Sequence, residues 1–307
     1  MAHDISAILD EQSQENVARD LAVIAQSNCF YVKLFLALYV RVLEQRSAVI
    51  DALYELYCEP RILSARELPP TAADTLQYSV DAGGETVAIR ETPRVISGAG
   101  TTGLRTWEAA LYMLNYLNNS ASFSLISRGK RILELGTGTG LVLLALLKKH
   151  SQHQFASIAL TDGDSALLEN LPATFALNGL PPRVPVNVSQ LIWGEELLYS
   201  EASGGPGRAP ADIVVAADVT YDSLVVPSLC DTMAQFFQAG ASVAYVAATI
   251  RNTATIEVWE AELDRRFSWT ICDAVADPHG SELTCWFRRG TPEIRVYEIR
   301  GGRASGV

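Results

Sequence analysis

The residues best suited to chemistry are three glycines in a turn between an apolar strand pattern and an apolar helix pattern. Gly136, Gly138 and Gly140 follow the apolar run at 132–135 and directly precede Leu141. Glycine has no Cβ, so such a turn can take positive φ and let a ligand touch the backbone. The amides that open the helix then favour a polar or anionic group. Leu141 stands where the dinucleotide fingerprint Gly-x-Gly-x-x-Gly needs glycine, which disfavours NAD or NADP.

An acidic and an aromatic residue end the next two predicted strands. Asp162 follows the strand predicted at 157–161, and Trp193 ends the one predicted at 184–192. In an open α/β sheet, ligands bind at the carboxyl ends of the strands, where an acidic residue accepts hydrogen bonds from ribose. A tryptophan there can stack on a purine ring. The alternatives are a role in the turn for Asp162, beside Asp164 as helix cap, and packing against the sheet for Trp193.

A carboxylate and a phenol follow the strand predicted at 212–217. Asp218 and Tyr221 come directly after this nearly all-apolar run, a position that suits them to hold a polar ligand. The alternative for Asp218 is to cap the next helix, although Asp222 and Ser223 lie nearer to its start.

Two further positions are candidates for the rim of the site. Trp107 either packs in the core or closes over a ligand, and the pair at 251–252 either meets a substrate or simply begins a helix.

Strands alternate with helices from Lys130 onward, which predicts a parallel sheet covered on both faces. The predicted helices are 106–117, 141–149, 164–177, 223–237 and 254–266. The predicted strands are 131–135, 157–161, 184–192, 212–217, 242–248, 268–274 and 282–287. Only the short link 277–280 joins the last two strands, so they are expected to pair antiparallel. The fold class is therefore α/β, a Rossmann-like seven-stranded, mostly parallel sheet.

The region before residue 98 differs in pattern. Dense large apolar residues at 28–57 predict helices that pack on one another, and 78–90 predicts a small β-hairpin. We expect two parts, a helical N-terminal region at 1–97 that docks the substrate and a catalytic domain at 98–307. The Gly- and Pro-rich stretch 202–210 predicts a loop without a functional role.

Composition limits the partners of this chain. Its 24 basic and 35 acidic residues give a net charge of −11, which disfavours binding to nucleic acid. Five scattered cysteines predict free thiols and no zinc site. No stretch is apolar enough to span a membrane. We expect a cytoplasmic enzyme that is monomeric and binds no metal.

Five motifs together resemble the seven-β-strand protein-lysine methyltransferases of methyltransferase family 16, and most of all the elongation factor 2 lysine methyltransferases. The motifs are Thr-Thr-Gly-Leu-Arg-Thr-Trp-Glu from residue 101, Ile-Leu-Glu-Leu-Gly-Thr-Gly-Thr-Gly-Leu from 132, Leu-Ile-Trp-Gly from 191, Ala-Ala-Asp-Val-Thr-Tyr-Asp from 216 and Thr-Ile-Arg-Asn from 249. The resemblance implies the cofactor S-adenosyl-L-methionine (AdoMet) and a protein substrate, elongation factor 2.

The resemblance also assigns roles to single residues. Asp218 and Tyr221 take the catalytic positions of the Asp-x-x-Tyr motif. The cofactor-binding positions are Trp107, Gly136, Gly138, Asp162, Trp193 and Ala217.

Three rival functions have weaker support. An NAD(P) oxidoreductase would carry a third glycine at position 141 and a Tyr-x-x-x-Lys pair, and this chain has neither. A nucleic-acid amino-methyltransferase would carry Pro-Pro in place of Val219-Thr220. An inactive AdoMet-binding module is disfavoured because Asp162, Asp218 and Tyr221 are all intact. A methyltransferase that acts on another protein or on a small molecule stays open.

Overall fold

The computed structural model describes residues 10–46, 48–81, 83–98, 100–149, 153–179, 184–196 and 211–302. The chain forms two compact units, 1–75 and 76–307. The loop predicted at 202–210 lies outside the described residues. The boundary between the two units lies between residues 75 and 76. The functional division expected at residue 97 stays a prediction.

The described part of the first unit contains four helices: α1 (Glu11–Ile24), α2 (Cys29–Glu44), α3 (Asp51–Tyr57) and α4 (Pro60–Leu63). Its core consists of buried aliphatic side chains from all four helices, among them Leu21, Leu36, Leu53 and Ile62. The sequence did not predict α1, because most of its residues are polar. Instead, Asp10 caps this helix by accepting a hydrogen bond from the amide of Ser13 at 2.9 Å.

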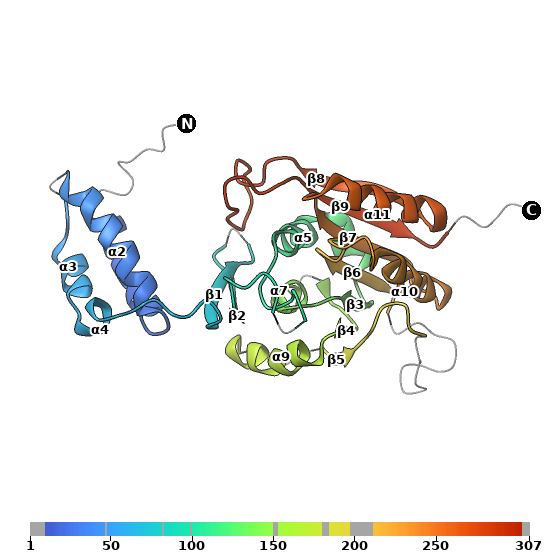
Figure 1. The fold of residues 1–307 in the computed structure, drawn as a ribbon, viewed down its shortest axis with the longest axis horizontal. Coiled ribbons are helices and arrows are strands. Elements are labelled where there is room, and N and C mark those ends of the chain that lie inside the picture. The colour runs from blue at the N-terminus through green and yellow to red at the C-terminus, as the bar shows by residue number, and fades with distance from the viewer. Residues whose placement is uncertain are drawn as a thin grey trace, which may run out of the picture. The chain divides into compact units, whose positions relative to one another are not determined.

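The second unit is built on a seven-stranded sheet (Figure 1). Its strands are β3 (Arg131–Leu135), β4 (Ser157–Asp162), β5 (Val186–Gln190), β6 (Ile213–Ala217), β7 (Val243–Thr249), β8 (Ser268–Val275) and β9 (Ile294–Arg300). They lie in the order β5-β4-β3-β6-β7-β9-β8, and the first five are parallel. β9 runs antiparallel to both β7 and β8. The predicted fold class and the seven-stranded, mostly parallel sheet are confirmed. The antiparallel partner of β8 is β9 and not the segment predicted at 282–287.

The predicted strand at 282–287 is wrong, because the last strand lies at Ile294–Arg300. Cys285 and Phe287 are buried and Trp286 between them is exposed, which imitates the alternation of a strand. This alternation comes from packing on other elements: the Cys285 thiol donates to the carbonyl of Ser79 at 3.1 Å.

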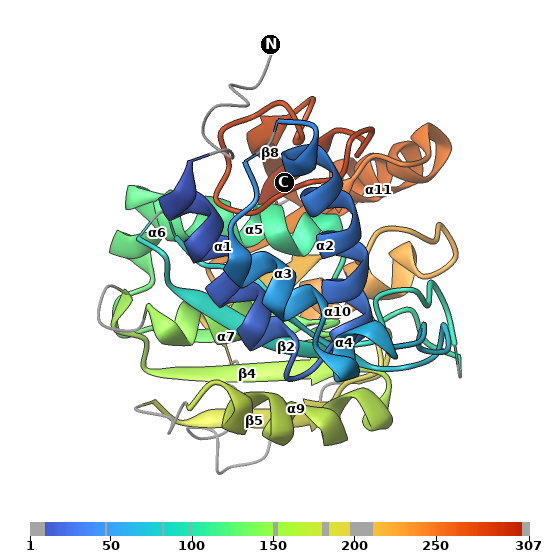
Figure 2. The same ribbon diagram turned by 90° about the vertical axis from the view of Figure 1, so that its left-hand side faces the viewer.

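Helices cover both faces of the sheet, as Figure 1 shows. α5 (Glu108–Asn119), α7 (Leu141–Lys148) and α9 (Ser165–Leu177) pack on one face, with the short α6 (Ala121–Ile126) beside α5. α10 (Val226–Gln238) and α11 (Thr253–Arg266) pack on the other face. At the edge of the sheet formed by β5, α9 lies along β5 and β4 (Figure 2).

The predicted hairpin forms a two-stranded sheet of β1 (Asp74–Ser79) and β2 (Thr86–Glu91). Asn178, at the end of α9, fastens β2 with its side-chain amide. Its oxygen accepts from the Ala88 amide at 2.8 Å, and its nitrogen donates to the Ala88 carbonyl at 2.7 Å. These bonds hold β2 against the end of α9 within the second unit.

None of the helices in the described part of the chain combines the length and apolarity needed to cross a membrane. All five cysteines are free, as expected.

Candidate active site

A cavity of about 620 Å³ opens where β3, β4 and β6 end, within the size range of small-molecule sites. β3 lies at the centre of the sheet, with β4 on one side and β6 on the other, so the order of strands reverses at this point. Every residue predicted to bind a cofactor or act in catalysis lines this cavity: Trp107, Gly136, Gly138, Asp162, Trp193, Ala217, Asp218 and Tyr221.

The glycine turn forms one wall of the cavity in a conformation that suits glycine alone. Gly136, Gly138 and Gly140 have φ of +64°, +51° and +80°. A Cβ on Gly136 would lie 2.9 Å from a methyl carbon of Val219 and 3.2 Å from the ring of Trp193. Glycine at position 136 therefore permits Val219 and Trp193 to pack closely on the turn that lines the cavity.

Asp162 is placed to receive a ribose. One carboxylate oxygen accepts from the Gly138 amide at 2.9 Å and the other from the Asp164 amide at 3.1 Å. Each oxygen has a second lone pair, so the carboxylate can accept two further hydrogen bonds. Burial raises the pKa of Asp162, against the amide of Gly138, which lowers it. Asp164 caps α9 through the amide of Ala166, as predicted.

Two tryptophans flank the cavity. Trp193 lies against the glycine turn and also packs on the core between the sheet, α10 and α11. Trp107 immediately precedes α5, and its indole nitrogen donates to the carbonyl of Thr102 at 2.9 Å. A glycine wall, an acidic ribose partner and flat aromatic side chains together fit AdoMet.

Asp218 is buried and holds more internal contacts than the sequence indicated. Its φ of +55° is rare for a residue with a side chain. Two donors reach Oδ1 and three reach Oδ2, all at 3.0 to 3.1 Å. They are the Ala109 amide, the amide and hydroxyl of Thr249, and two nitrogens of Arg251. These contacts use the lone pairs that a carboxylate offers.

The helix that Asp218 meets differs from the one considered in the sequence. α10 begins at Val226 without a side-chain cap, and neither Asp218 nor Ser223 bonds its first turn. Asp218 instead bonds the first turn of α5, 109 residues earlier in the chain. Tyr221 lies at the cavity with 53% of its surface exposed.

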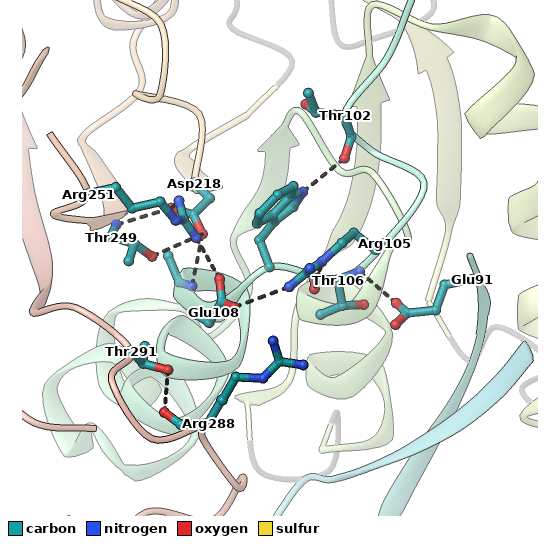
Figure 3. Close-up of polar contacts among 12 residues, drawn as sticks. Glu91, Thr102, Arg105, Thr106, Glu108, Asp218, Thr249, Arg251, Arg288 and Thr291 are labelled. Atoms are coloured by element: carbon teal, nitrogen blue, oxygen red, sulfur yellow. Dashed lines mark hydrogen bonds and ion pairs between the residues drawn. The ribbon is translucent and has the colours of Figure 1, made fainter. Parts of the chain in front are cut away.

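Charged side chains surround Asp218 (Figure 3), and the sequence had named only Arg251 among them, as a candidate for the rim. Arg251 also contacts Glu108 at 2.6 Å, and Glu108 contacts Arg105 at 3.1 Å. The guanidinium carbons of Arg105 and Arg251 lie 4.2 and 4.9 Å from the ring centre of Trp107, within the range of cation–π attraction. Asn252 caps α11 through the amide of Ala254, so the pair at 251–252 splits between the site and the helix start.

Glu134, in the motif but without a predicted role, is the most deeply buried carboxylate of the cavity wall. Burial raises its pKa to about 8, although the Thr137 hydroxyl donates to it at 2.7 Å. Its position just before the glycine turn was the feature of the sequence from which its place in the cavity wall could have been predicted. Among the described residues, no three His, Cys, Asp or Glu side chains gather as a metal site would require.

Comparison with known proteins agrees with this geometry. A sequence model of the lysine methyltransferase family matches residues 95–262. The protein-lysine N-methyltransferase EFM3 of Saccharomyces cerevisiae is 33% identical over 276 residues, covering 83% of this chain and 77% of the relative. The protein-lysine N-methyltransferase EEF2KMT of Homo sapiens is 30% identical over 277 residues, covering 85% and 78%. The mouse EEF2KMT is 32% identical over 269 residues, covering 82% and 74%. The chain therefore belongs to the lysine methyltransferase family, the AdoMet-dependent enzymes that methylate lysine side chains of proteins.

Proposed function

We propose that this enzyme methylates a lysine of translation elongation factor 2 in the cytoplasm. The observation that carries the proposal is its similarity to EFM3 and EEF2KMT over more than four fifths of the chain. The resemblance of the motifs to the elongation factor 2 lysine methyltransferases supplies the substrate. The acidic net charge of −11 supports a protein substrate over a nucleic acid.

The chemistry requires a neutral amine beside the cofactor. When bound, AdoMet supplies a methyl group on a positively charged sulfur. The lysine nitrogen bonds to that carbon as the carbon–sulfur bond breaks, and the amine proton passes to solvent. A lysine has a pKa near 10.4, so about one in two thousand is neutral at pH 7. Positioning and deprotonation of the amine are therefore the tasks of the protein.

We propose that Asp218 and Tyr221 form the corner that receives this amine. The support is their place at the cavity together with the Asp-x-x-Tyr match. Since internal donors surround both oxygens of Asp218, we assign the direct hydrogen bond to the Tyr221 hydroxyl. Asp218 fixes the corner and supplies its charge. Trp107, Gly136, Gly138, Asp162, Trp193 and Ala217 hold the cofactor in this proposal.

We further propose that the first unit docks the substrate. One face of α2 supplies core residues such as Val32 and Leu36, whereas Tyr31, Leu34, Leu38 and Val42 stay outside that core and are exposed. Apolar side chains at this spacing form a stripe along the helix. Leu34→Glu together with Leu38→Glu should raise the KM for the whole protein substrate without changing AdoMet affinity.

Intact-protein mass spectrometry tests the substrate. Purified elongation factor 2, produced in cells that lack this enzyme, is incubated with AdoMet and the wild-type chain. We expect gains in steps of about 14 Da, located to a single lysine by peptide mapping. Tyr221→Phe removes one exposed hydroxyl and should reduce the rate at least tenfold with unchanged AdoMet affinity.

Two results would contradict these proposals separately. An unmodified elongation factor 2, with transfer from labelled AdoMet to a different protein of the same cell extract, would refute the substrate. AdoMet binding without transfer to any protein would favour an inactive binding module.

A further inference from the structure

Arg251 joins three elements of the site through one guanidinium. It contacts both oxygens of Asp218 at 3.1 Å and one oxygen of Glu108 at 2.6 Å. Asp218 follows β6, Arg251 follows β7 and Glu108 opens α5. A two-pronged contact to a carboxylate fixes its orientation as well as its charge. Arg251 is therefore placed to hold the 218–221 corner in position.

The charges within this cluster cancel. Asp218 and Glu108 carry two negative charges, and Arg251 and Arg105 carry two positive ones. Burial opposes the charge of Arg251, yet Asp218 and Glu108 hold the pKa of the guanidinium above its usual value. Arg251 thus stays charged at every pH at which the enzyme works.

The surrounding elements add few other charges that face the site. Glu134 on β3 and Asp162 on β4 line the cavity, and Tyr221 and Asp222 follow Asp218 on its own segment. Arg288, in the segment between β8 and β9, extends toward the cluster in Figure 3. The indole ring of Trp107, which carries no charge, lies beside both guanidinium groups, with its centre 4.2 Å from the guanidinium carbon of Arg105 and 4.9 Å from that of Arg251.

A lone carboxylate would work against the reaction. An opposite charge within about 4–6 Å favours the charged form of a titratable group, which shifts its pKa by roughly 1–3 units. Asp218 without a counter-charge would therefore hold a nearby lysine as ammonium, which cannot accept the methyl group. The two-pronged contact of Arg251 offsets the charge of Asp218 and keeps the 218–221 corner in place.

We propose that Arg251 is a positioning residue that fixes Asp218 and offsets its charge, so that the site receives the substrate lysine as a neutral amine. The proposal rests on the proposed methylation of a lysine at the 218–221 corner. It assigns the deprotonation to the charge balance around the site and needs no separate general base.

The test is the pH dependence of kcat at saturating AdoMet and protein substrate, because kcat reports groups that titrate in the bound complex. Arg251→Met removes the charge and keeps an apolar stem. We expect the rising limb of kcat to move up by about 1–3 pH units, so that the rate falls roughly 10- to 1,000-fold at neutral pH and recovers near pH 10. Arg251→Lys retains the charge and should keep the limb within half a unit of wild type, with a lower plateau.

A second variant should move the limb in the opposite direction. Glu108→Gln removes one negative charge and leaves the cluster net positive, so the limb should shift to lower pH. Arg265→Met is the matched control, because Arg265 pairs with Glu262 on the exposed surface of α11, away from the cavity. Its profile should coincide with that of the wild type.

A uniform loss of kcat in Arg251→Met at every pH, with the limb unmoved, would overturn the proposal and leave Arg251 a structural residue. If Arg251→Met does not fold, an unmoved limb in Glu108→Gln overturns it equally. These outcomes differ from a failure of the proposed function, in which the wild-type chain itself would transfer no methyl group to a protein lysine.

Discussion

Glu134 shows how the site sets its own electrostatics at the scale of one residue. Burial raises the pKa of this carboxyl from 4.5 to about 8, so at neutral pH it carries a proton in the folded chain. In the unfolded chain the carboxyl of Glu134 has its ordinary pKa, so it is ionised at neutral pH. Unfolding between these two pKa values therefore releases a proton, and stability falls as pH rises through that window.

The first prediction follows from this sign. Between pH 5.5 and 7.5, Glu134 should cost the wild type about 1.4 kcal/mol of unfolding free energy per pH unit. Glu134→Gln removes the titrating group. The unfolding free energy of the variant, relative to that of the wild type, should therefore rise by this amount with each pH unit. Urea unfolding at three pH values measures the difference. Parallel curves for the two proteins would show that Glu134 is ionised in the folded chain.

The second prediction concerns the glycine turn. Gly136→Ala places a Cβ at 2.9 Å from Val219, at a backbone φ of +64°. We expect AdoMet affinity to fall at least tenfold in calorimetry, because the turn must shift into the cavity. Gly290→Ala is the matched control: it has a φ of +83°, but its Cβ would meet nothing within 4 Å. Equal affinities of both variants would show that the wall of the cavity tolerates a Cβ at position 136.

Most of the predicted residues of the cavity wall could be found from the sequence because they lie at or just after the end of an apolar strand. Trp107 precedes α5 instead, and the resemblance of its motif supplied its role. The charged cluster around Asp218 could not be predicted from the sequence. Glu108 and Arg251 are 143 residues apart, and no local pattern pairs them. The contacts of Asp218 with α5 likewise depend on the packing of elements distant in the chain.

Elements with strong apolar patterns were predicted well, and elements defined by packing were not. β6 and β7 are continuous apolar runs, which is typical of central parallel strands. β9 is a central strand as well, but Arg295, Glu298 and Arg300 interrupt its pattern. The predicted strand at 282–287 failed for the opposite reason, since its alternation reflects contacts outside any sheet.

The third prediction concerns the junction of α9 with the hairpin. Asn178→Ala removes both hydrogen bonds to Ala88 and one to the Thr174 carbonyl. Because the partly buried backbone amide of Ala88 would lose its partner, unfolding free energy should fall by about 1–3 kcal/mol. Asn170→Ala, which removes one exposed bond on the same helix, should change it by less than about 0.5 kcal/mol. Equal effects would show that the hairpin does not depend on Asn178.

The whole molecule consists of two units, and the ligand site belongs to one of them. The described residues that line the cavity all lie between Gly100 and Ser228, within the second unit. The first unit has its own core of aliphatic side chains.

The fourth prediction uses this separation. The demethylated product of AdoMet, at one hundred times its Kd, should stabilise the second unit by about 2.7 kcal/mol. Hydrogen exchange followed by mass spectrometry should then slow in β3, β4 and β6, while α1 and α2 exchange at unchanged rates. Slower exchange in α1 and α2 would reveal energetic coupling between the units.

The position of β9 has a consequence for synthesis of the chain. β9 is made after β8 but lies between β8 and β7 in the sheet. While the ribosome extends the chain, β8 has no neighbouring strand to pair with, and the outer edge of β7 stays unpaired. The sheet closes only when residues 294–300 have emerged, which leaves two strand edges open to other chains until that moment. A ribosome stalled between β8 and β9 should therefore display an incomplete domain that binds chaperones, whereas one stalled well past β9 should display a folded one.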